Sequence, residues 1–393
     1  MSDSISKAVQ EPCTPGHAVG AVVSQWPEKK PMWPNHRLVD LLGIEHPLIL
    51  APMAGLGTVE LAAAVCAGGG LGSLGCVGLR PERVMQAIDK LRTLTGKPIN
   101  TNFFCHGAAR ADPAREANWR DQLTPYYKEF GLDLSHSTGQ SEILPFNDAL
   151  CRVVEQVKPE VVSFHFGLPE PALLARVKVA GCRVMASATT VVEASWLEAR
   201  GADVIIAQGC EAGGHRGMFL AANLAEEAAS QPSTLALVPQ IADAVGVPIV
   251  AAGGIADGRG IAAAFALGAA GVQIGTAYLF CPEAAISPLY RDALRQARAD
   301  TTVLTDVFTG RPARAFSNRL TRELGPLRGV APDFPTAMLA LAPLRRKAEQ
   351  QGSREFSPHW AGQAAPLGKE MPAEALTRAL AESALERFRQ LAG

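Results

Sequence analysis

The sequence has almost no net charge and lacks any apolar run long enough to cross a membrane. Lys and Arg total 37 residues, Asp and Glu total 38, and the formal net charge is −1. Binding nucleic acid through a basic surface needs an excess of Lys and Arg, so we expect no nucleic-acid partner. Gly, Pro or charged residues interrupt the apolar stretches well short of about 20 residues, which predicts no membrane span. The first residues lack a signal-peptide pattern, so we expect a cytoplasmic protein.

The cysteines lack the spacing that disulfide frameworks and zinc sites require. All 8 stand singly, and no CxxC pair occurs in the 393 residues. In a chain of this length, isolated cysteines indicate reduced thiols rather than a disulfide scaffold. No metal site is predicted, because no group of ligands has a metal-binding spacing.

Short apolar runs recur along the chain, each followed by a stretch with helical periodicity. Continuous rather than alternating apolar character indicates burial on both faces, which is typical of a parallel sheet. Eight such units over roughly 240 residues predict a TIM (β/α)8 barrel. A doubly wound open sheet is the alternative fold. The eight runs are 47–52, 71–75, 99–104, 161–166, 183–188, 203–208, 247–254 and 270–276.

Three regions lie outside the simple barrel pattern. Prolines break the periodicity of residues 1–36, which predicts an irregular N-terminal arm, docked through Trp26 and Trp33. The barrel is expected over 37–282, with residues 105–146 as an insertion after the third strand. Residues 283–393 predict a helical extension that packs outside the barrel or covers its mouth. Two interpretations remain for the insertion's aromatic residues, which either line the site or anchor the insertion: Trp119, Tyr126 and Tyr127.

In a TIM barrel, functional residues lie where the strands end at the C-terminal face. The first run leads into Pro52, Met53 and Ala54, and this turn allows close approach to a flat ligand. The third run carries Asn102, which either holds a cofactor or satisfies a local turn. His165 lies within the fourth run between aromatic residues, and a hydrogen-bonded core histidine is at least as plausible there as a catalytic one.

The sixth run leads into the most informative segment, QGCEAGGHRG over residues 208–217. Its glycines, among them Gly213 and Gly214, allow the backbone to approach a ligand closely. His215 is the natural general base near neutral pH, so a functional loop is expected. Cys210 has no adjacent base implied by the sequence, and we interpret it as a bystander.

The seventh and eighth runs have glycine-rich ends, which predict a phosphate site. In TIM barrels, the backbone N–H groups at the ends of these two strands commonly hold a phosphate. The spacing is neither GxGxxG after a first strand nor GxxxxGK[ST], so dinucleotide-binding and P-loop folds are excluded. The residues concerned are Gly253, Gly254, Gln273, Ile274, Gly275 and Thr276.

Six segments in this order resemble the nitronate monooxygenases, formerly called 2-nitropropane dioxygenases. They are PLILAPMAG, NTNFF, FHFG, QGCEAGGHRG, PIVAAGGIADGRG and QIGT. The resemblance runs from about residue 40 to about residue 320, and WAGQ at 360–363 is similar to a late motif of the family. EAGGHRG is the most specific segment, since the glycine-rich strand ends also occur in other FMN barrels.

The resemblance implies one non-covalent FMN, which the residues alone do not establish. It implies a ring near Pro52, Met53, Asn102, Gln208 and Gly213, with Ala54, Gly214 and Gly253 close by, and a phosphate among Gly254 and residues 273–276. It also implies that His215 acts as the base when a neutral nitroalkane is the substrate. The reaction with O2 would then produce a carbonyl compound and nitrite, with alkyl nitronates and propionate-3-nitronate as the substrate class.

Other functions remain open from the sequence. NAD(P)H-dependent flavin reductases of the enoyl-ACP reductase and quinone reductase types share several of these motifs. An IMP dehydrogenase would need a catalytic cysteine in its own loop context, which is absent. A flavin-binding barrel without turnover is the non-enzymatic alternative. A homodimer is compatible with the sequence.

Overall fold

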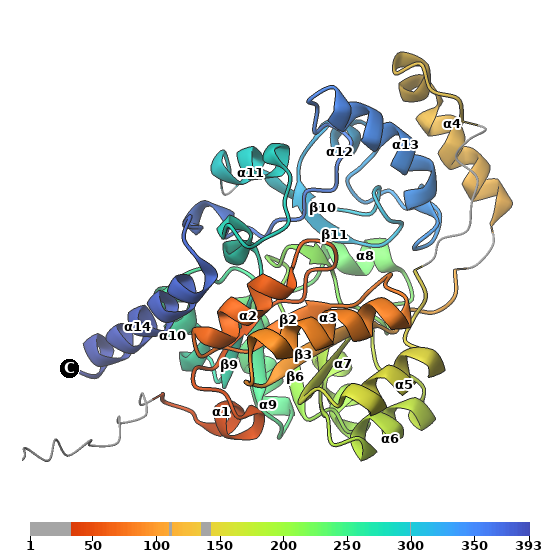
Figure 1. The fold of residues 1–393 in the computed structure, drawn as a ribbon. Helices are drawn as coiled ribbons and strands as arrows, with labels where there is room; N and C mark the ends of the chain where they lie inside the picture. The colour runs from red at the N-terminus through yellow and green to blue at the C-terminus, as the bar shows by residue number, and fades with distance from the viewer. Residues whose placement is uncertain (1–32, 110–111, 135–142, 299) are drawn as a thin grey trace, which may run out of the picture.

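Eight parallel strands form the centre of the molecule in a computed structural model that describes residues 33–109, 112–134, 143–298 and 300–393. Their order is β1-β9-β8-β6-β5-β4-β3-β2, and a parallel bridge between Ile49 and Leu71 joins the two edges. The prediction of a TIM barrel is therefore confirmed (Figure 1). The strands are β1 (Leu48–Leu50), β2 (Gly72–Gly75), β3 (Ile99–Phe104), β4 (Val161–His165), β5 (Arg183–Ala188), β6 (Val204–Gln208), β8 (Ile249–Ala252) and β9 (Gly271–Ile274).

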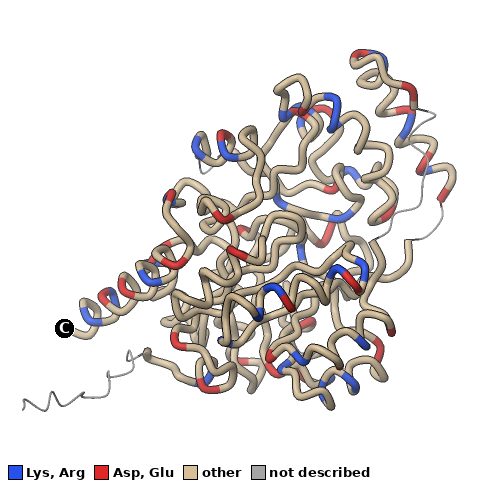
Figure 2. Tube along the Cα trace, viewed as in Figure 1, with Lys and Arg blue, Asp and Glu red and all other residues tan. Residues whose placement is uncertain are grey.

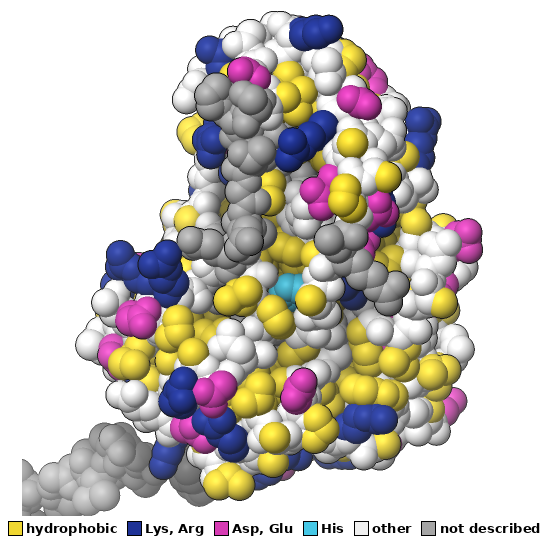
Figure 3. Space-filling model, turned by 90° about the vertical axis from the view of Figure 1, so that its right-hand side faces the viewer, with side chains coloured by type: hydrophobic (Ala, Val, Ile, Leu, Met, Phe, Trp, Pro, Cys, Tyr) yellow, Lys and Arg dark blue, Asp and Glu magenta, His cyan; other side chains and the backbone are white. Residues whose placement is uncertain are grey.

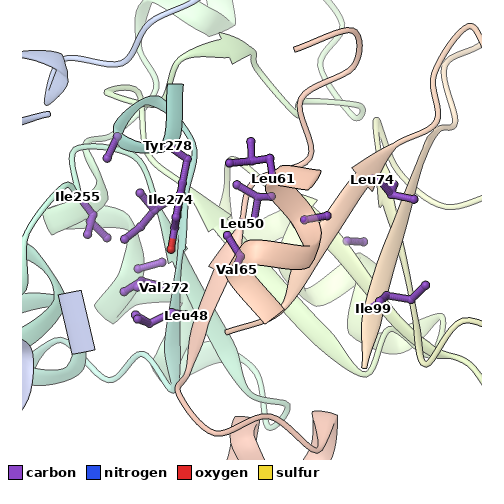
Figure 4. Close-up of a cluster of buried hydrophobic side chains, with 14 of the residues drawn as sticks. Leu48, Leu50, Leu61, Val65, Leu74, Ile99, Ile255, Val272, Ile274 and Tyr278 are labelled. Carbon is purple, nitrogen blue, oxygen red and sulfur yellow. The ribbon is translucent and has the colours of Figure 1, made fainter. Parts of the chain in front are cut away.

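Both faces of the barrel strands are buried, in two separate clusters. Alternate residues of a strand point to opposite sides of the sheet. Ile49 of β1 points into the barrel, where Leu38 and Leu42 of α1 (Arg37–Leu42) fill the bottom. The outward set packs under the helices, and Figure 4 shows part of it: Leu48, Leu50, Val272 and Ile274 from the strands with Leu61 and Val65 from a helix.

Helices follow the strands and cover the outside of the barrel. Several begin at a side chain that accepts a hydrogen bond from the first turn, as Thr58, Thr190 and Asp257 do, which explains where these helices start. The helices are α2 (Val59–Ala67), α3 (Pro81–Leu94), α5 (Asp148–Val157), α6 (Pro171–Val179), α7 (Val191–Ala199), α9 (Thr234–Ala244) and α10 (Gly258–Ala266), with the 3₁₀ turn η2 (Thr276–Phe280) after β9.

The insertion after β3 contains α4 (Pro113–Glu129), which packs against α13 (Ala337–Gln350) of the C-terminal region. Trp119 Nε1 donates to the carbonyl of Ala337, and the Tyr127 hydroxyl donates to the carbonyl of Ala340. Tyr126 donates to Glu323. Of the two interpretations, anchoring is the observed one, because these aromatic residues contact the C-terminal region and do not line the central cavity.

The C-terminal region contains a small antiparallel sheet in addition to the predicted helices. β10 (Thr302–Thr305) and β11 (Ala313–Phe316) form an antiparallel pair, and β11 also pairs with β7 (Gly214–His215). The helical elements of the region, besides α13, are α11 (Pro288–Arg295), α12 (Arg319–Leu324), η3 (Ala365–Leu367) and α14 (Ala373–Ala392). The short helix α8 (Leu224–Ala229) lies earlier in the chain, between β7 and α9. α14 lies outside the barrel beside α10 (Figure 1). α13 contributes side chains to the wall of the cavity described below.

Trp33 packs against the outside of the barrel. Its ring stacks on Phe265 of α10 and contacts Phe388 of α14 edge-on. Trp26 and the rest of residues 1–32 lie outside the described residues, so the predicted arm and the domain boundaries stay predictions.

Charged side chains of both signs alternate along the outer helices, as Figure 2 shows. Within the described ranges, no helix is long and apolar enough to cross a membrane. The seven cysteines that these ranges contain are all free thiols.

Candidate active site

A cavity of about 720 Å³ lies at the C-terminal ends of the barrel strands. The C-terminal region forms its other wall, through residues such as Phe334, Met338 and Trp360. Figure 3 shows a hollow on this side of the molecule, with histidine atoms visible among hydrophobic side chains. The lining includes these predicted site residues: Pro52, Met53, Ala54, Asn102, Gln208, Gly213, Gly214, His215, Gly253, Gly254, Gln273, Gly275 and Thr276.

Ile274 is the predicted site residue whose side chain does not reach the cavity. It is 1% exposed and packs in the outer hydrophobic cluster with Leu48 and Val272 (Figure 4). The cause is the two-residue period of a strand, which directs neighbouring Gln273 to the cavity and Ile274 away from it. Only the backbone of Ile274 can contribute to a ligand site there.

Two amide side chains at the strand ends are held by protein contacts. Asn102 Nδ2 lies 3.1 Å from the carbonyl oxygen of Ser163 and 3.0 Å from its hydroxyl. Gln208 Nε2 donates to the carbonyl of His215 at 2.9 Å, and its Oε1 accepts from the N–H of Gly217 at 2.7 Å. Gln208 thus ties the end of β6 to the glycine-rich loop, in addition to facing the cavity.

A glycine turn follows β8, the seventh strand of the barrel. Gly253 and Gly254 have φ of +108° and +71°, values that favour glycine because it has no Cβ. Beside them, the buried Oε1 of Gln273 has no hydrogen-bond partner among the described residues. Thr276 accepts from the N–H of Gly362 at 3.0 Å, so the C-terminal region closes this end of the cavity. A turn of this kind can take an anion, and the amide oxygen needs a donor.

His215 lies in β7 and faces the cavity among aromatic rings. The ring centroids of Phe104, Phe334 and Trp360 lie 6.0, 5.5 and 5.3 Å from its own. Burial lowers the pKa of His215 to about 3, with further lowering by His165 and Arg311. The imidazole is therefore neutral near pH 7, with one unprotonated ring nitrogen.

His165 also borders the cavity, but both of its ring nitrogens have protein partners. Nε2 lies 3.2 Å from the carbonyl oxygen of His215, and Nδ1 lies 3.0 Å from the hydroxyl of Ser187. A carbonyl only accepts, so Nε2 carries the proton and Nδ1 accepts from Ser187. Burial lowers the pKa of His165 to about 3. These contacts match the core-histidine interpretation, with His165 supporting the strand that carries His215.

Arg216 is fully buried and has a structural place in the loop. Its Nη1 and Nη2 donate to the carbonyls of Gly209 and Gln208 at 2.5 and 2.6 Å, and its Nε donates to Gln231 Oε1 at 2.6 Å. The guanidinium thereby fastens both ends of the turn between β6 and β7. Burial lowers its pKa to about 10, which still leaves it charged at neutral pH.

The loop contains two further reactive side chains, Cys210 and Glu211. Burial raises the pKa of the Cys210 thiol, and Cys210 does not line the cavity, in agreement with a bystander role. The Glu211 carboxylate accepts from the N–H and the hydroxyl of Thr234 at the start of α9. Neither side chain is arranged as a nucleophile with an adjacent base.

Sequence reasoning missed the residues that the C-terminal region brings to His215. Thr309 Oγ1 lies 3.1 Å from His215 Nε2, and Phe334 and Met338 border the same cavity. No motif marks these positions, and they lie about 95 or more residues from His215 along the chain. Only the pairing of β7 with β11 brings them together.

A (β/α)8 barrel whose strand ends border a cavity, with a glycine turn after the seventh strand and a histidine facing the cavity, has the architecture of a TIM-barrel enzyme. Within this class, the family model described as nitronate monooxygenase matches residues 35–383. The chain belongs to the nitronate monooxygenase family, a family of flavin-dependent oxidoreductases. The resemblance of the sequence motifs is confirmed.

Individual relatives agree with the family. A protein from Pseudomonas aeruginosa named nitronate monooxygenase is 43% identical over 348 residues, which cover 88% of this chain and 98% of the relative. A nitronate monooxygenase from Paraburkholderia phytofirmans is 42% identical over 90% of this chain and 97% of its own length. The structure of a nitroalkane oxidase from Streptomyces ansochromogenes has a TM-score of 0.82 and 37% identity, and covers 90% of this chain and 99% of that one.

Proposed function

We propose that this protein is an FMN-dependent nitronate monooxygenase that oxidises alkyl nitronates, and neutral nitroalkanes, with O2 to a carbonyl compound and nitrite. The observation that carries the proposal is the neutral His215, which faces a cavity ringed by aromatic side chains beside the glycine turn. The names of the Pseudomonas and Streptomyces relatives support this substrate class.

The residues around the cavity fit FMN. The turn at Gly253 and Gly254 suits a phosphate, because a backbone without Cβ atoms lets N–H groups approach its oxygens. The unpartnered Oε1 of Gln273 suits a ribityl hydroxyl, which supplies the donor that the oxygen lacks. Pro52 and Met53 line the cavity and offer apolar side chains to a flavin ring. When bound, FMN supplies the electron transfer between nitronate and O2.

His215 takes the proton from the carbon beside the nitro group when the substrate is neutral. The rings of Phe104, Phe334 and Trp360 surround the imidazole and burial keeps it uncharged, so a ring lone pair is free in the resting enzyme. Gln208 and His165 both donate to the His215 carbonyl, which fixes the backbone of β7. An already anionic nitronate needs no base, and the cavity then serves to orient it.

The experiment that tests the function measures O2 uptake and nitrite release with nitroethane, 2-nitropropane and their preformed nitronates. We expect turnover of both forms, with one nitrite released for each molecule of substrate consumed. The reductase alternative is tested by mixing the protein with NADH under anaerobic conditions. Rapid bleaching of the flavin, with no nitrite from any nitronate, would replace our proposal by a reductase. A homodimer and a cytoplasmic location stay predictions.

Substituting Gly254 by alanine is expected to weaken FMN binding at least tenfold. The added Cβ lies in the turn proposed for the phosphate, at a φ of +71° that strains any residue with a Cβ. Gly352→Ala is the matched control, since its φ of +75° imposes similar strain while its Cβ meets nothing within 4 Å. Fluorescence titration of the apoprotein with FMN measures both dissociation constants. Equal affinity in the two variants would contradict a phosphate at Gly254.

A further inference from the structure

One hydroxyl group connects the proposed base to a buried turn of the C-terminal region. Thr309 is 2% exposed, and its Oγ1 lies 3.1 Å from Nε2 of His215. The same oxygen lies 3.1 Å from the carbonyl oxygen of Arg311 and 3.3 Å from the Arg311 N–H nitrogen. Three polar groups therefore share a single hydroxyl that has one proton and two lone pairs.

The chemistry of these three groups determines where the protons lie. The Arg311 carbonyl can only accept, so the Thr309 hydroxyl donates its proton there. The Arg311 N–H can only donate, and it occupies one lone pair of Oγ1. The remaining lone pair faces His215, and a contact at 3.1 Å then requires a proton on Nε2.

This proton on Nε2 leaves the lone pair of the neutral imidazole on Nδ1. Nδ1 makes no hydrogen bond with any described residue. It is also absent from the fully buried polar atoms that lack a partner in the described ranges, so its surface is not enclosed by protein. Because His215 borders the cavity, the free nitrogen is the one accessible from it. The hydrogen bond made by one ring nitrogen sets the tautomer and hence the basicity of the other.

We propose that Thr309 is the positioning residue that selects the Nε2–H tautomer of His215, so that Nδ1 is the atom that accepts the substrate proton. The inference rests on the proposed function, because it assigns an atom and a partner to the base named there. Thr309 acts through His215 and is not itself a catalytic residue.

The turn that carries Thr309 is held in place by its surroundings. Gly310 has a φ of +80°, and a Cβ there would lie 1.8 Å from the carbonyl oxygen of Pro332. Its N–H donates to the carbonyl of Asp306 at 2.8 Å. The Arg311 guanidinium lies 3.8 Å from the centroid of the Phe166 ring and donates to the carbonyl of Met218. The hydroxyl is therefore presented to His215 by a packed turn next to β11.

The test compares Thr309→Val, which removes the hydroxyl at similar volume, with Thr309→Ser, which retains it. We expect Thr309→Val to lower the ratio of kcat/KM for nitroethane to kcat/KM for ethyl nitronate about ten- to hundredfold, since only the neutral substrate needs a base. Thr309→Ser is expected to keep the ratio within about threefold of the wild type. A merely structural role would lower both activities together and leave the ratio unchanged, which overturns the proposal.

A direct measurement of the tautomer keeps the proposal testable if Thr309→Val fails to fold. Nitrogen NMR of protein with ring-labelled histidine, with the His215 signal assigned from His215→Gln, is expected to show protonated Nε2 and unprotonated Nδ1. The opposite tautomer in the wild type overturns the inference. His215→Ala distinguishes failure of the proposed function from failure of this inference. Full nitroalkane turnover in His215→Ala would show that His215 is not the base. Loss of turnover in His215→Ala, together with an unchanged ratio in Thr309→Val, would overturn only the role of Thr309.

Discussion

Replacing His215 by alanine is expected to lower kcat/KM for a neutral nitroalkane about 10²- to 10⁴-fold, the usual contribution of a positioned general base. The side chain is the neutral imidazole that faces the cavity. The neighbouring His165 is bonded to Ser187 and to the His215 carbonyl, and Arg311 is bonded to the Met218 carbonyl. FMN content is expected to stay at the wild-type level, because the glycine turn does not contact this ring. Steady-state nitrite release and the flavin absorption spectrum measure the two effects.

A surface histidine provides the control for this substitution. His36 is exposed at the start of α1, and His36→Ala is expected to leave turnover unchanged. Preformed nitronates, which carry no proton to remove, should lose far less activity than nitroalkanes in His215→Ala. Equal losses on both substrate forms would show that His215 binds or orients the substrate instead of deprotonating it.

The pH dependence follows from the same side chain. Burial holds the pKa of His215 at about 3, so the base is unprotonated from neutral pH down to that value in the free enzyme. The profile of kcat/KM for a nitroalkane should therefore show no decline near pH 6.5, where an ordinary histidine would gain its proton. In the unfolded chain, the side chain titrates near 6.5, so its contribution to stability falls as the pH drops from about 6.5 towards 3.

Replacing Arg216 by methionine is expected to lower the free energy of unfolding by about 3–5 kcal/mol. The substitution removes the donors to the carbonyls of Gln208 and Gly209 and to Gln231, and each buried acceptor left unpaired costs about 1–3 kcal/mol. The loop between β6 and β7 also loses its fastening, so nitrite release should fall together with stability. Urea unfolding followed by fluorescence measures the change.

Two further variants define what Arg216 contributes. Arg216→Lys keeps the charge but presents a single ammonium in place of the planar fork, and we expect it to recover only part of the stability. Arg389→Met removes an arginine from the exposed side of α14, with an expected change within about 0.5 kcal/mol. If Arg216→Met proved as stable as Arg389→Met, the buried contacts would have no net stabilising effect.

The barrel was predictable from the sequence because its strands are buried on both faces. Continuous apolar runs such as 204–208 identify such strands, and their alternation with helices limits the fold to very few arrangements. The strand ends then place most of the cavity residues without knowledge of any contact. Ile274 shows the limit of this reasoning, since an adjacent residue on the same strand points the opposite way.

The wall that the C-terminal region contributes to the cavity could not be predicted in the same way. β7 has two residues and β11 has four, too few for any periodicity, and their pairing joins segments about 100 residues apart. The structural role of Arg216 could not be predicted either, because a charged residue in a glycine-rich loop is equally typical of a functional site. Two of its acceptors are backbone carbonyls, which every residue has, so the sequence does not indicate them.

The pairing of β7 with β11 also has a consequence for the order in which the cavity forms during synthesis. Every barrel strand lies before residue 275, whereas β11 begins at residue 313 and Thr309 comes just before it. A nascent chain that has only released the barrel already contains the glycine turn, but its histidine has no strand partner. The contact between Thr309 and His215 therefore forms only after residues 309–316 have been synthesised, and a chain that ends before β11 would lack both this contact and the C-terminal wall of the cavity.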